Sequence, residues 1–191
     1  MPKNKKIGLL GGSFNPAHSG HVYISEQAIT ALDLDEVWWL VNPLNPFKEE
    51  RDMLPLSQRI AYAKSLNKNP AVKVTDLERE SGTRYTADTL DYITKHYPKV
   101  DFVWLMGDDL LPEFHLWKDW QKIPDMVDIA VFPRTMTEKQ LDLIPAVNFI
   151  KEKGKWHYIN ISPVSFSASE IRNNILDNKE IIKGMENDKT R

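Results

Sequence analysis

A short segment near the start of the chain combines paired glycines, a turn and two histidines. Gly11–His21 reads GGSFNPAHSGH and follows an apolar run that is typical of a buried strand. Paired glycines let the backbone approach a ligand closely, and Asn-Pro favours a turn. His18 and His21 share one face of the helix that Ser19 is expected to cap. This pattern predicts a phosphate site, because helix N-termini attract anions and imidazole can donate to phosphate. The alternative is a plain strand-to-helix turn with two surface histidines.

A second segment, Ser165–Arg172, reads SFSASEIR and suggests related chemistry. Ser167 and Glu170 have the spacing of a capping box, which by itself explains the segment as the start of a well-capped helix. Ser169 and Arg172 lie three residues apart on the first turns of that helix. A hydroxyl and a guanidinium at a helix N-terminus can hold phosphate, so the segment is either a structural cap or a second phosphate site.

Three further segments are compatible with a ligand site or with a structural role. In TRYTADTL, Thr86 can cap a helix, and the free N–H groups near Tyr85 and Thr86 would suit an acidic group. In MGDDLLPEFHLWKDW, the carboxylates suit ribose hydroxyls or Mg²⁺, and Trp117 can stack on an aromatic ring or lie in the core. Lys48 ends a Pro-rich loop, from which a cation could close over triphosphate.

Composition and missing motifs argue against several other classes of protein. The chain has 191 residues, 25 Lys and Arg, 27 Asp and Glu, and no Cys. Thiolate chemistry is therefore excluded, and a net charge of −2 gives no basic field for nucleic acid. No apolar run approaches the roughly 20 residues of a membrane span, and we expect a cytoplasmic protein. The sequence contains no GxSxG, HExxH or GxxxxGK[ST], which argues against an ester hydrolase, a zincin and a P-loop enzyme.

Apolar strands alternate with helical patterns along the chain. We expect strands at 6–10, 36–41, 72–77, 100–106, 127–132 and 156–161, and helices at 19–32, 56–66, 86–96, 138–151 and 168–176. Pro145 is expected to kink or cut the fourth of these helices. The alternation predicts a doubly wound parallel sheet in one α/β domain over 1–191, with ligands beyond the carboxyl ends of the strands. The polar tail at 179–191 is expected to be a short helix or frayed.

Together the motifs resemble the nucleotidyltransferase superfamily that has a paired-histidine HxGH motif, here His18-Ser19-Gly20-His21. SFSASEIR resembles its second motif, ISSTxIR. RYTADTL and the GDD segment with Trp117 are similar to one branch, the bacterial nicotinate-nucleotide adenylyltransferases. The resemblance spans residues 5–176 and departs from the pattern in three places. The PPHK loop reads Asn45-Pro46-Phe47-Lys48, GAD reads GDD, and SST reads Ser167-Ala168-Ser169.

The resemblance implies a Rossmann-like fold and transfer of AMP from ATP, with Mg²⁺, to nicotinate mononucleotide. The products would be deamido-NAD and pyrophosphate, in NAD biosynthesis, without an enzyme nucleophile or a protein-bound metal. The implied catalytic residues are His18, His21, Lys48 and Arg172. The implied ATP and phosphate contacts are Gly11, Gly12, Ser13, Phe14, Ser167 and Ser169, and the implied nicotinate-nucleotide contacts are Tyr85, Thr86, Asp109 and Trp117.

Three alternatives stay open at this point, and so does assembly into a homo-oligomer. The acceptor could be nicotinamide mononucleotide, whose amide needs a hydrogen-bond acceptor such as Asp88 or Asp108. A phosphopantetheine adenylyltransferase would share both phosphate motifs, but it gives no reason for RYTADTL or Trp117. A non-catalytic nucleotide-binding paralogue is disfavoured by the intact histidines and Arg172.

Overall fold

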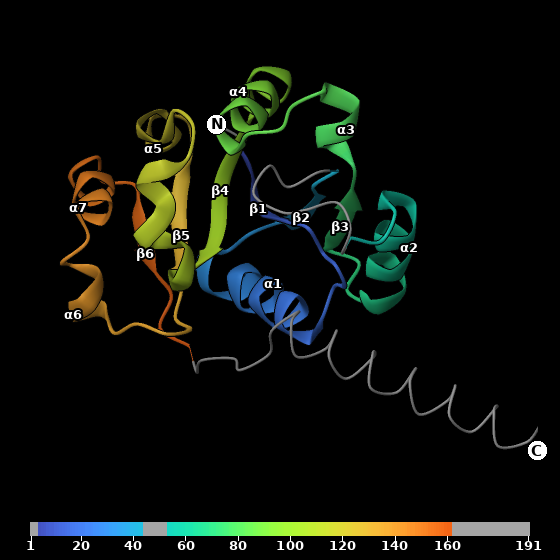
Figure 1. Cartoon of the computed structure of the whole chain (residues 1–191), viewed down its shortest axis with the longest axis horizontal. Helices are drawn as coiled ribbons and strands as arrows, with labels where there is room; N and C mark the ends of the chain where they lie inside the picture. The colour runs from blue at the N-terminus through green and yellow to red at the C-terminus, as the bar shows by residue number, and fades with distance from the viewer. Residues whose placement is uncertain (1–3, 44–52, 162–191) are drawn as a thin grey trace, which may run out of the picture.

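Six parallel strands form one sheet at the centre of the structure, a computed structural model that describes residues 4–43 and 53–161 (Figure 1). The strands are β1 Lys5–Gly12, β2 Glu36–Val41, β3 Val72–Thr75, β4 Val100–Gly107, β5 Asp128–Phe132 and β6 Trp156–Tyr158. Their order is β3-β2-β1-β4-β5-β6, and every neighbouring pair is parallel. This is the predicted Rossmann-like α/β fold. The central strands read as continuous apolar runs because helices cover both faces.

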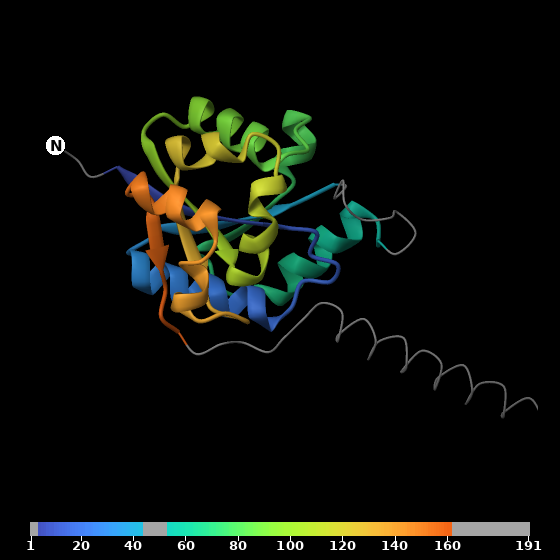
Figure 2. The ribbon, with the colours of Figure 1, turned by 60° about the vertical axis from the view of Figure 1, so that its left-hand side comes forward.

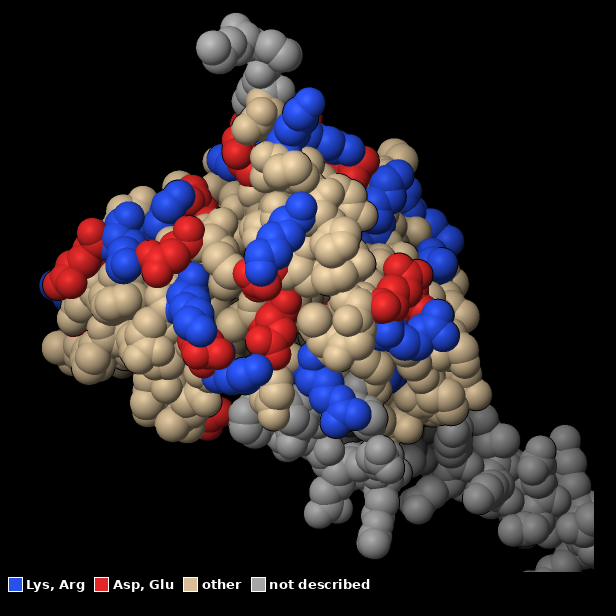
Figure 3. Space-filling view, turned by 90° about the horizontal axis from the view of Figure 1, so that it is seen from above, with Lys and Arg blue, Asp and Glu red and all other residues tan. Residues whose placement is uncertain are grey.

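Helices cover both faces of this sheet (Figures 1 and 2). The helices are α1 Ser19–Leu32, α2 Leu56–Leu66, α3 Leu77–Ser81, α4 Thr86–His96, α5 Ile123–Met126, α6 Glu138–Leu141 and α7 Pro145–Glu152, with 3-10 helices η2 Asp108–Leu116 and η3 Trp120–Lys122. α1 and α2 lie on one face, and α3 and α4 lie on the other. Over the latter face, Lys and Arg side chains are interspersed with Asp and Glu (Figure 3).

Each face of the sheet has its own apolar core. The cluster beneath α1 and α2 includes Phe14, Ala28 and Trp39, all less than 2% exposed. The cluster beneath α3 and α4 includes Leu90 and Trp104. β1 and β4, the two central strands, supply side chains to both clusters, so the point where they end is held firmly from both sides.

The structure differs from the expected elements mainly after β3. The strand ends at Thr75, whose hydroxyl accepts the N–H of Leu77 at 3.1 Å, and α3 begins where we expected the strand to continue. Gly82, with a φ of 71°, then ends α3. Pro145 begins α7 and so divides the helix expected at 138–151, because an interior proline cannot donate the required hydrogen bond. β6 stops at Tyr158, three residues short of the strand expected at 156–161. The helix expected at 168–176 and the tail at 179–191 lie outside the described residues.

A buried arginine on α2 holds the loop that follows β1. Arg59 is 1% exposed, and its guanidinium donates to four backbone carbonyls. These belong to Ser13 (2.5 Å), Asn42 (2.8 Å), Pro43 (3.0 Å) and Leu54 (2.8 Å). The arginine therefore ties the turn after β1 to the end of β2 and to the segment before α2.

Replacing this arginine should destabilise the fold strongly. Arg59→Met keeps the apolar stem but leaves four carbonyls without their donor, so we expect a loss of at least about 3 kcal/mol in the free energy of unfolding. Urea denaturation followed by circular dichroism measures this loss. Lys64→Met, at an exposed position of the same helix, is the matched control and should change stability by less than about 0.5 kcal/mol. Equal effects of the two substitutions would contradict the anchoring role.

Candidate active site

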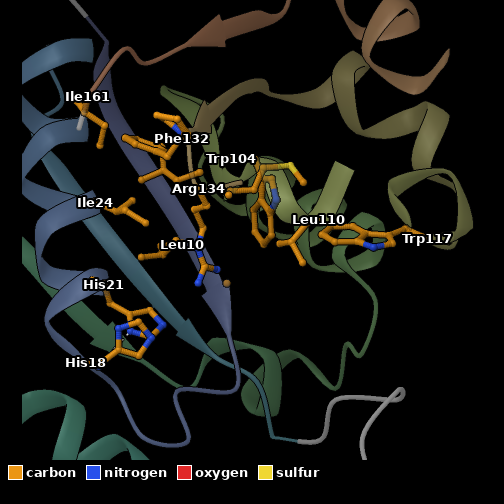
Figure 4. A pocket seen from close by; sticks show the side chains of 16 residues that line it. Leu10, His18, His21, Ile24, Trp104, Leu110, Trp117, Phe132, Arg134 and Ile161 are labelled. Atoms are coloured by element: carbon orange, nitrogen blue, oxygen red, sulfur yellow. Dashed lines mark hydrogen bonds between the residues drawn. The ribbon is translucent and has the colours of Figure 1, made fainter. Parts of the chain in front are cut away.

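A pocket opens at the carboxyl ends of β1, β4 and β5, between α1 and η2 (Figure 4). After β1 the chain crosses to β2 on one side, and after the adjacent β4 it crosses to β5 on the other side, so the pocket lies at the switch point of the sheet. The lining residues come from all three strand ends and from the neighbouring helices. They include Leu10, Gly11, His18, His21, Ile24, Trp104, Met106, Gly107, Leu110, Trp117, Phe132, Arg134 and Ile161.

The two histidines lie together at the start of α1, as the sequence predicts. Their ring centroids are 3.8 Å apart, and both side chains line the pocket. His18, rather than the expected Ser19, is the N-cap residue. The reason is local, because the backbone N–H of His18 donates to Nδ1 of His21 at 3.1 Å. His21 thereby takes the role of the Glu or Gln at the third helical position of a capping box, whose side chain accepts the N–H of the N-cap residue.

Both imidazoles are neutral at physiological pH. Burial, reinforced by the charge of Arg134, lowers the pKa of His18 from 6.5 to about 4. Burial lowers the pKa of His21 to about 3, with smaller contributions from His18 and Arg134. Since Nδ1 of His21 accepts a hydrogen bond, the neutral ring has its proton on Nε2. His21 therefore presents an N–H donor without a net charge.

Phe14 supports the histidines from behind. Its side chain is 1% exposed, 4.5 Å from the ring of His21 and 5.2 Å from the ring of Trp39, measured between centroids. The side chain of Phe14 is therefore part of the core, and contact of this residue with phosphate through its backbone stays a prediction. The ring belongs to the apolar core because the turn directs it inward, with a φ of 46° at Phe14.

The two glycines at the end of β1 have different roles. Gly11 lines the pocket, and a Cβ there would collide with the indole of Trp104. Gly12 makes no such contact, and its carbonyl accepts the N–H of Asn42 at 2.9 Å. The carbonyl of Ser13 is likewise occupied, by Arg59. Only Gly11 of these three lines the pocket, and the other two fix the turn.

Arg134, which the sequence analysis did not identify, brings a positive charge to the pocket. It follows the end of β5, and its side chain extends toward His18 and His21 (Figure 4). Its Nη1 lies 2.9 Å from Oδ2 of Asp109. The available signal was its place, two residues after the end of the strand expected at 127–132. In a parallel sheet, side chains that follow such strands meet at one edge.

Asp108 is structural, so its expected roles with ribose, Mg²⁺ or an amide are wrong. It is fully buried and accepts the backbone N–H groups of Arg134 (2.9 Å), Thr135 (3.0 Å) and Met136 (2.9 Å). These bonds fix the loop after β5. The adjacent Gly107 leaves room for the ion pair, because a Cβ there would collide with Asp109 and lie 2.8 Å from Cδ of Arg134.

The structure brings the Tyr85-Thr86 segment beside the segment that contains Trp117. Trp117 lines the pocket. The next residue, Lys118, binds Asp88 of α4 at 2.9 Å and lies 5.0 Å from the ring centroid of Tyr85. Tyr85, rather than Thr86, is the N-cap of α4, and no side chain caps this end. The first N–H groups of α4 therefore lack the hydroxyl partner that we expected.

A chain of buried and partly buried hydroxyls fixes the turn before Tyr85. The hydroxyl oxygen of Thr89 lies 3.2 Å from a carboxyl oxygen of Glu78 and 2.9 Å from the hydroxyl of Thr83, and the hydroxyls of Ser81 and Thr83 are 2.8 Å apart. Burial raises the pKa of the Glu78 carboxyl to about 7. The network connects α3 to α4, so it sets where α4 begins.

Four predicted residues, Lys48, Ser167, Ser169 and Arg172, lie outside the described residues. Within residues 4–43 and 53–161, no three acidic or histidine side chains are grouped closely enough to hold a metal ion. No helix in the same two ranges is long and apolar enough to cross a membrane.

The parallel sheet with paired histidines at its switch point defines a nucleotidyltransferase. The family model described as cytidylyltransferase-like matches residues 9–174. The chain is 44% identical over 147 residues to a probable nicotinate-nucleotide adenylyltransferase of Parvibaculum lavamentivorans. That alignment covers 77% of this chain and 73% of the relative. It is 41% identical over 181 residues to a probable nicotinate-nucleotide adenylyltransferase of Cereibacter sphaeroides, and this alignment covers 87% of this chain and 95% of the relative. The chain therefore belongs to the nicotinate-nucleotide adenylyltransferase family.

A solved structure agrees with this fold. Nicotinic acid mononucleotide adenylyltransferase of Plasmodium falciparum, complexed with NaAD, matches with a TM-score of 0.73 at 21% identity. The match covers 88% of this chain and 83% of that one.

The lowered histidine pKa values predict a specific loss of stability in acid. Below pH 6.5 the unfolded chain binds protons that the folded histidines bind only near pH 4 and pH 3, so stability falls as the pH drops through this window. Each histidine adds at most about 1.4 kcal/mol per pH unit to this fall. His21→Gln should therefore reduce the slope of unfolding free energy between pH 6 and pH 5 by roughly this amount.

Urea denaturation across this pH range measures the slope. His115→Gln, on the exposed surface of η2, controls for loss of an imidazole elsewhere. An unchanged slope in His21→Gln would show that His21 gains its proton at the same pH in both states.

Proposed function

We propose that the pocket binds ATP and nicotinate mononucleotide and transfers AMP to the mononucleotide, forming deamido-NAD and pyrophosphate. The observation on which this rests most is the pair of imidazoles at the start of α1, facing Arg134 across the switch point (Figure 4). Phosphate chemistry suits this arrangement, because a helix N-terminus, N–H donors and a guanidinium all favour developing negative charge.

In the proposed reaction, a phosphate oxygen of the mononucleotide attacks the α-phosphorus of ATP. The bond to the β-phosphate breaks, and pyrophosphate leaves with the bonding electrons. The residues act by positioning and by charge stabilisation, with His18 and His21 donating to the ATP phosphates. Gly11 allows the chain to approach the nucleotide closely. Lys48, Ser167, Ser169 and Arg172 are proposed to hold the triphosphate from the other side.

We place the pyridine ring against Trp117 and its carboxylate at the start of α4. The N–H groups near Tyr85 and Thr86 favour an anion there. Asp109 is proposed to approach the nucleotide ribose, close to its ion pair with Arg134. The two acceptors considered for an amide are occupied, Asp108 by backbone N–H groups and Asp88 by Lys118. This arrangement favours the acid over nicotinamide mononucleotide.

We propose that Mg²⁺ enters the site with ATP as part of the substrate. Mg²⁺ retains much of its hydration and is commonly held by substrate phosphates and one or two carboxylates rather than by a protein cage. Its chemical contribution would be to neutralise charge on the triphosphate. We further expect cytoplasmic NAD biosynthesis and no nucleic acid partner, in keeping with the net charge of −2.

The proposed reaction predicts a paired result in a pyrophosphate-release assay. With ATP and Mg²⁺, nicotinate mononucleotide should support release and nicotinamide mononucleotide much less. His18→Ala should lower kcat by about 10²- to 10³-fold, as expected for loss of one donor to developing charge. His115→Ala, outside the pocket, serves as the control. Unchanged turnover in His18→Ala would remove the phosphate role of His18, and no release with either mononucleotide would contradict the proposed activity.

If Mg²⁺ binds only together with ATP, EDTA should affect activity but not the stability of the protein alone. EDTA should abolish pyrophosphate release, and excess Mg²⁺ should restore it. The same EDTA treatment should leave the Tm of the protein without ATP unchanged, because the proposal places no metal in the protein before ATP binds. A fall in Tm with EDTA alone would point instead to a metal held by the protein.

A further inference from the structure

An ion pair connects the two segments proposed to surround the pyridine ring. Nζ of Lys118 lies 3.1 Å and 2.9 Å from the two carboxylate oxygens of Asp88. The same ammonium lies 5.0 Å from the ring centroid of Tyr85, and Lys118 directly follows Trp117 in the pocket wall. The hydrogen bond to Asp88 raises the pKa of Lys118, so the ammonium stays charged. One cation thus lies beside both segments.

Asp88 creates an electrostatic problem for an acidic ligand at this place. It is the third residue of α4, so its carboxylate lies in the same first turn as the N–H groups proposed to hold the pyridine carboxylate. Two carboxylates at one helix end repel each other and compete for the same N–H groups. Lys118 cancels the charge of Asp88 at the point where that repulsion would arise.

We propose that Lys118 is a specificity-determining residue that makes the site favour a pyridine carboxylate over a carboxamide by balancing the charge of Asp88. This inference rests on the proposed function, since it assigns the acid preference of the same site. It depends on the net charge of the pair, which is zero in the native protein. A purely mechanical role, in which the pair only holds α4 against the Trp117 segment, would affect both acceptors equally.

Three substitutions separate charge from mechanical linkage. Lys118→Met leaves a net charge of −1 at the pair, Asp88→Asn leaves +1, and the double substitution restores zero while the ion pair is lost. The measured quantity is kcat/KM for nicotinate mononucleotide divided by kcat/KM for nicotinamide mononucleotide. We expect this ratio to fall about fivefold in Lys118→Met, to rise in Asp88→Asn and to return near the native value in the double variant.

Three further measurements sharpen this test. Lys118→Arg keeps the charge and should keep the native ratio. Lys122→Met removes a lysine from another exposed ion pair of the same segment, with Asp119, and is the matched control. The differences between the single variants should shrink at 1 M salt, where the Debye length is only about 3 Å. The dependence of both acceptors on ATP cancels in the ratio.

The outcomes distinguish this inference from the function on which it rests. Equal losses for both acceptors in Lys118→Met, with no recovery of the ratio in the double variant, would overturn the charge role. Pyrophosphate release with an unchanged ratio throughout the series would overturn the role of Lys118 and leave adenylyl transfer intact. No release with either acceptor in the native protein would overturn both proposals.

Discussion

The guanidinium of Arg59 is the interaction on which the phosphate end of the site depends. It is buried, and its donors meet carbonyls from three separate stretches of chain, including Ser13 of the turn after β1. A buried loop carries polar backbone groups that must find partners, and an irregular turn cannot satisfy them within itself. With the arginine in place, the turn is fixed on its inner side and α1 begins where His18 can cap it. The positions of the imidazoles therefore follow from a residue that does not line the pocket.

Asp108, a buried anion, fixes the loop after β5 on the opposite wall of the pocket. Its carboxylate gathers the N–H groups of the loop after β5, and that loop places Arg134 across the pocket from the histidines. One buried cation thus organises carbonyls on one side, and one buried anion organises N–H groups on the other. Because both loops are held before any ligand arrives, little reorganisation is needed when charge develops on the phosphates.

Patterns that depend on neighbours in sequence were predicted well, and those that depend on distant partners were not. The ranges Ser19–Leu32 and Thr86–His96 were predicted to the residue, because helical periodicity and local breakers define them. The close approach of His18 and His21 was predicted from their separation of three residues at the start of a helix. Arg134 and Asp108 were missed or misassigned because their contacts span about 26 positions of sequence. The inward position of the Phe14 ring could not be predicted for another reason, since only the backbone of the turn decides that it faces the core. The roles of Lys48, Ser167, Ser169 and Arg172 stay predictions.

The described part of the site balances its charges before a ligand binds. His18 and His21 are neutral, Arg134 is paired with Asp109, and Lys118 is paired with Asp88. Charges close together in a half-buried pocket would otherwise repel one another and raise the free energy of the empty fold. Pairing each cation with a carboxylate lowers that cost, and a polyanionic nucleotide can then compete for the same cations. The two ion pairs are proposed to serve different parts of the substrates. Arg134 faces the proposed phosphate position, and Lys118 lies beside the segments proposed for the acceptor ring. Discrimination between acceptors can therefore change at Lys118 without altering the charge that acts on ATP.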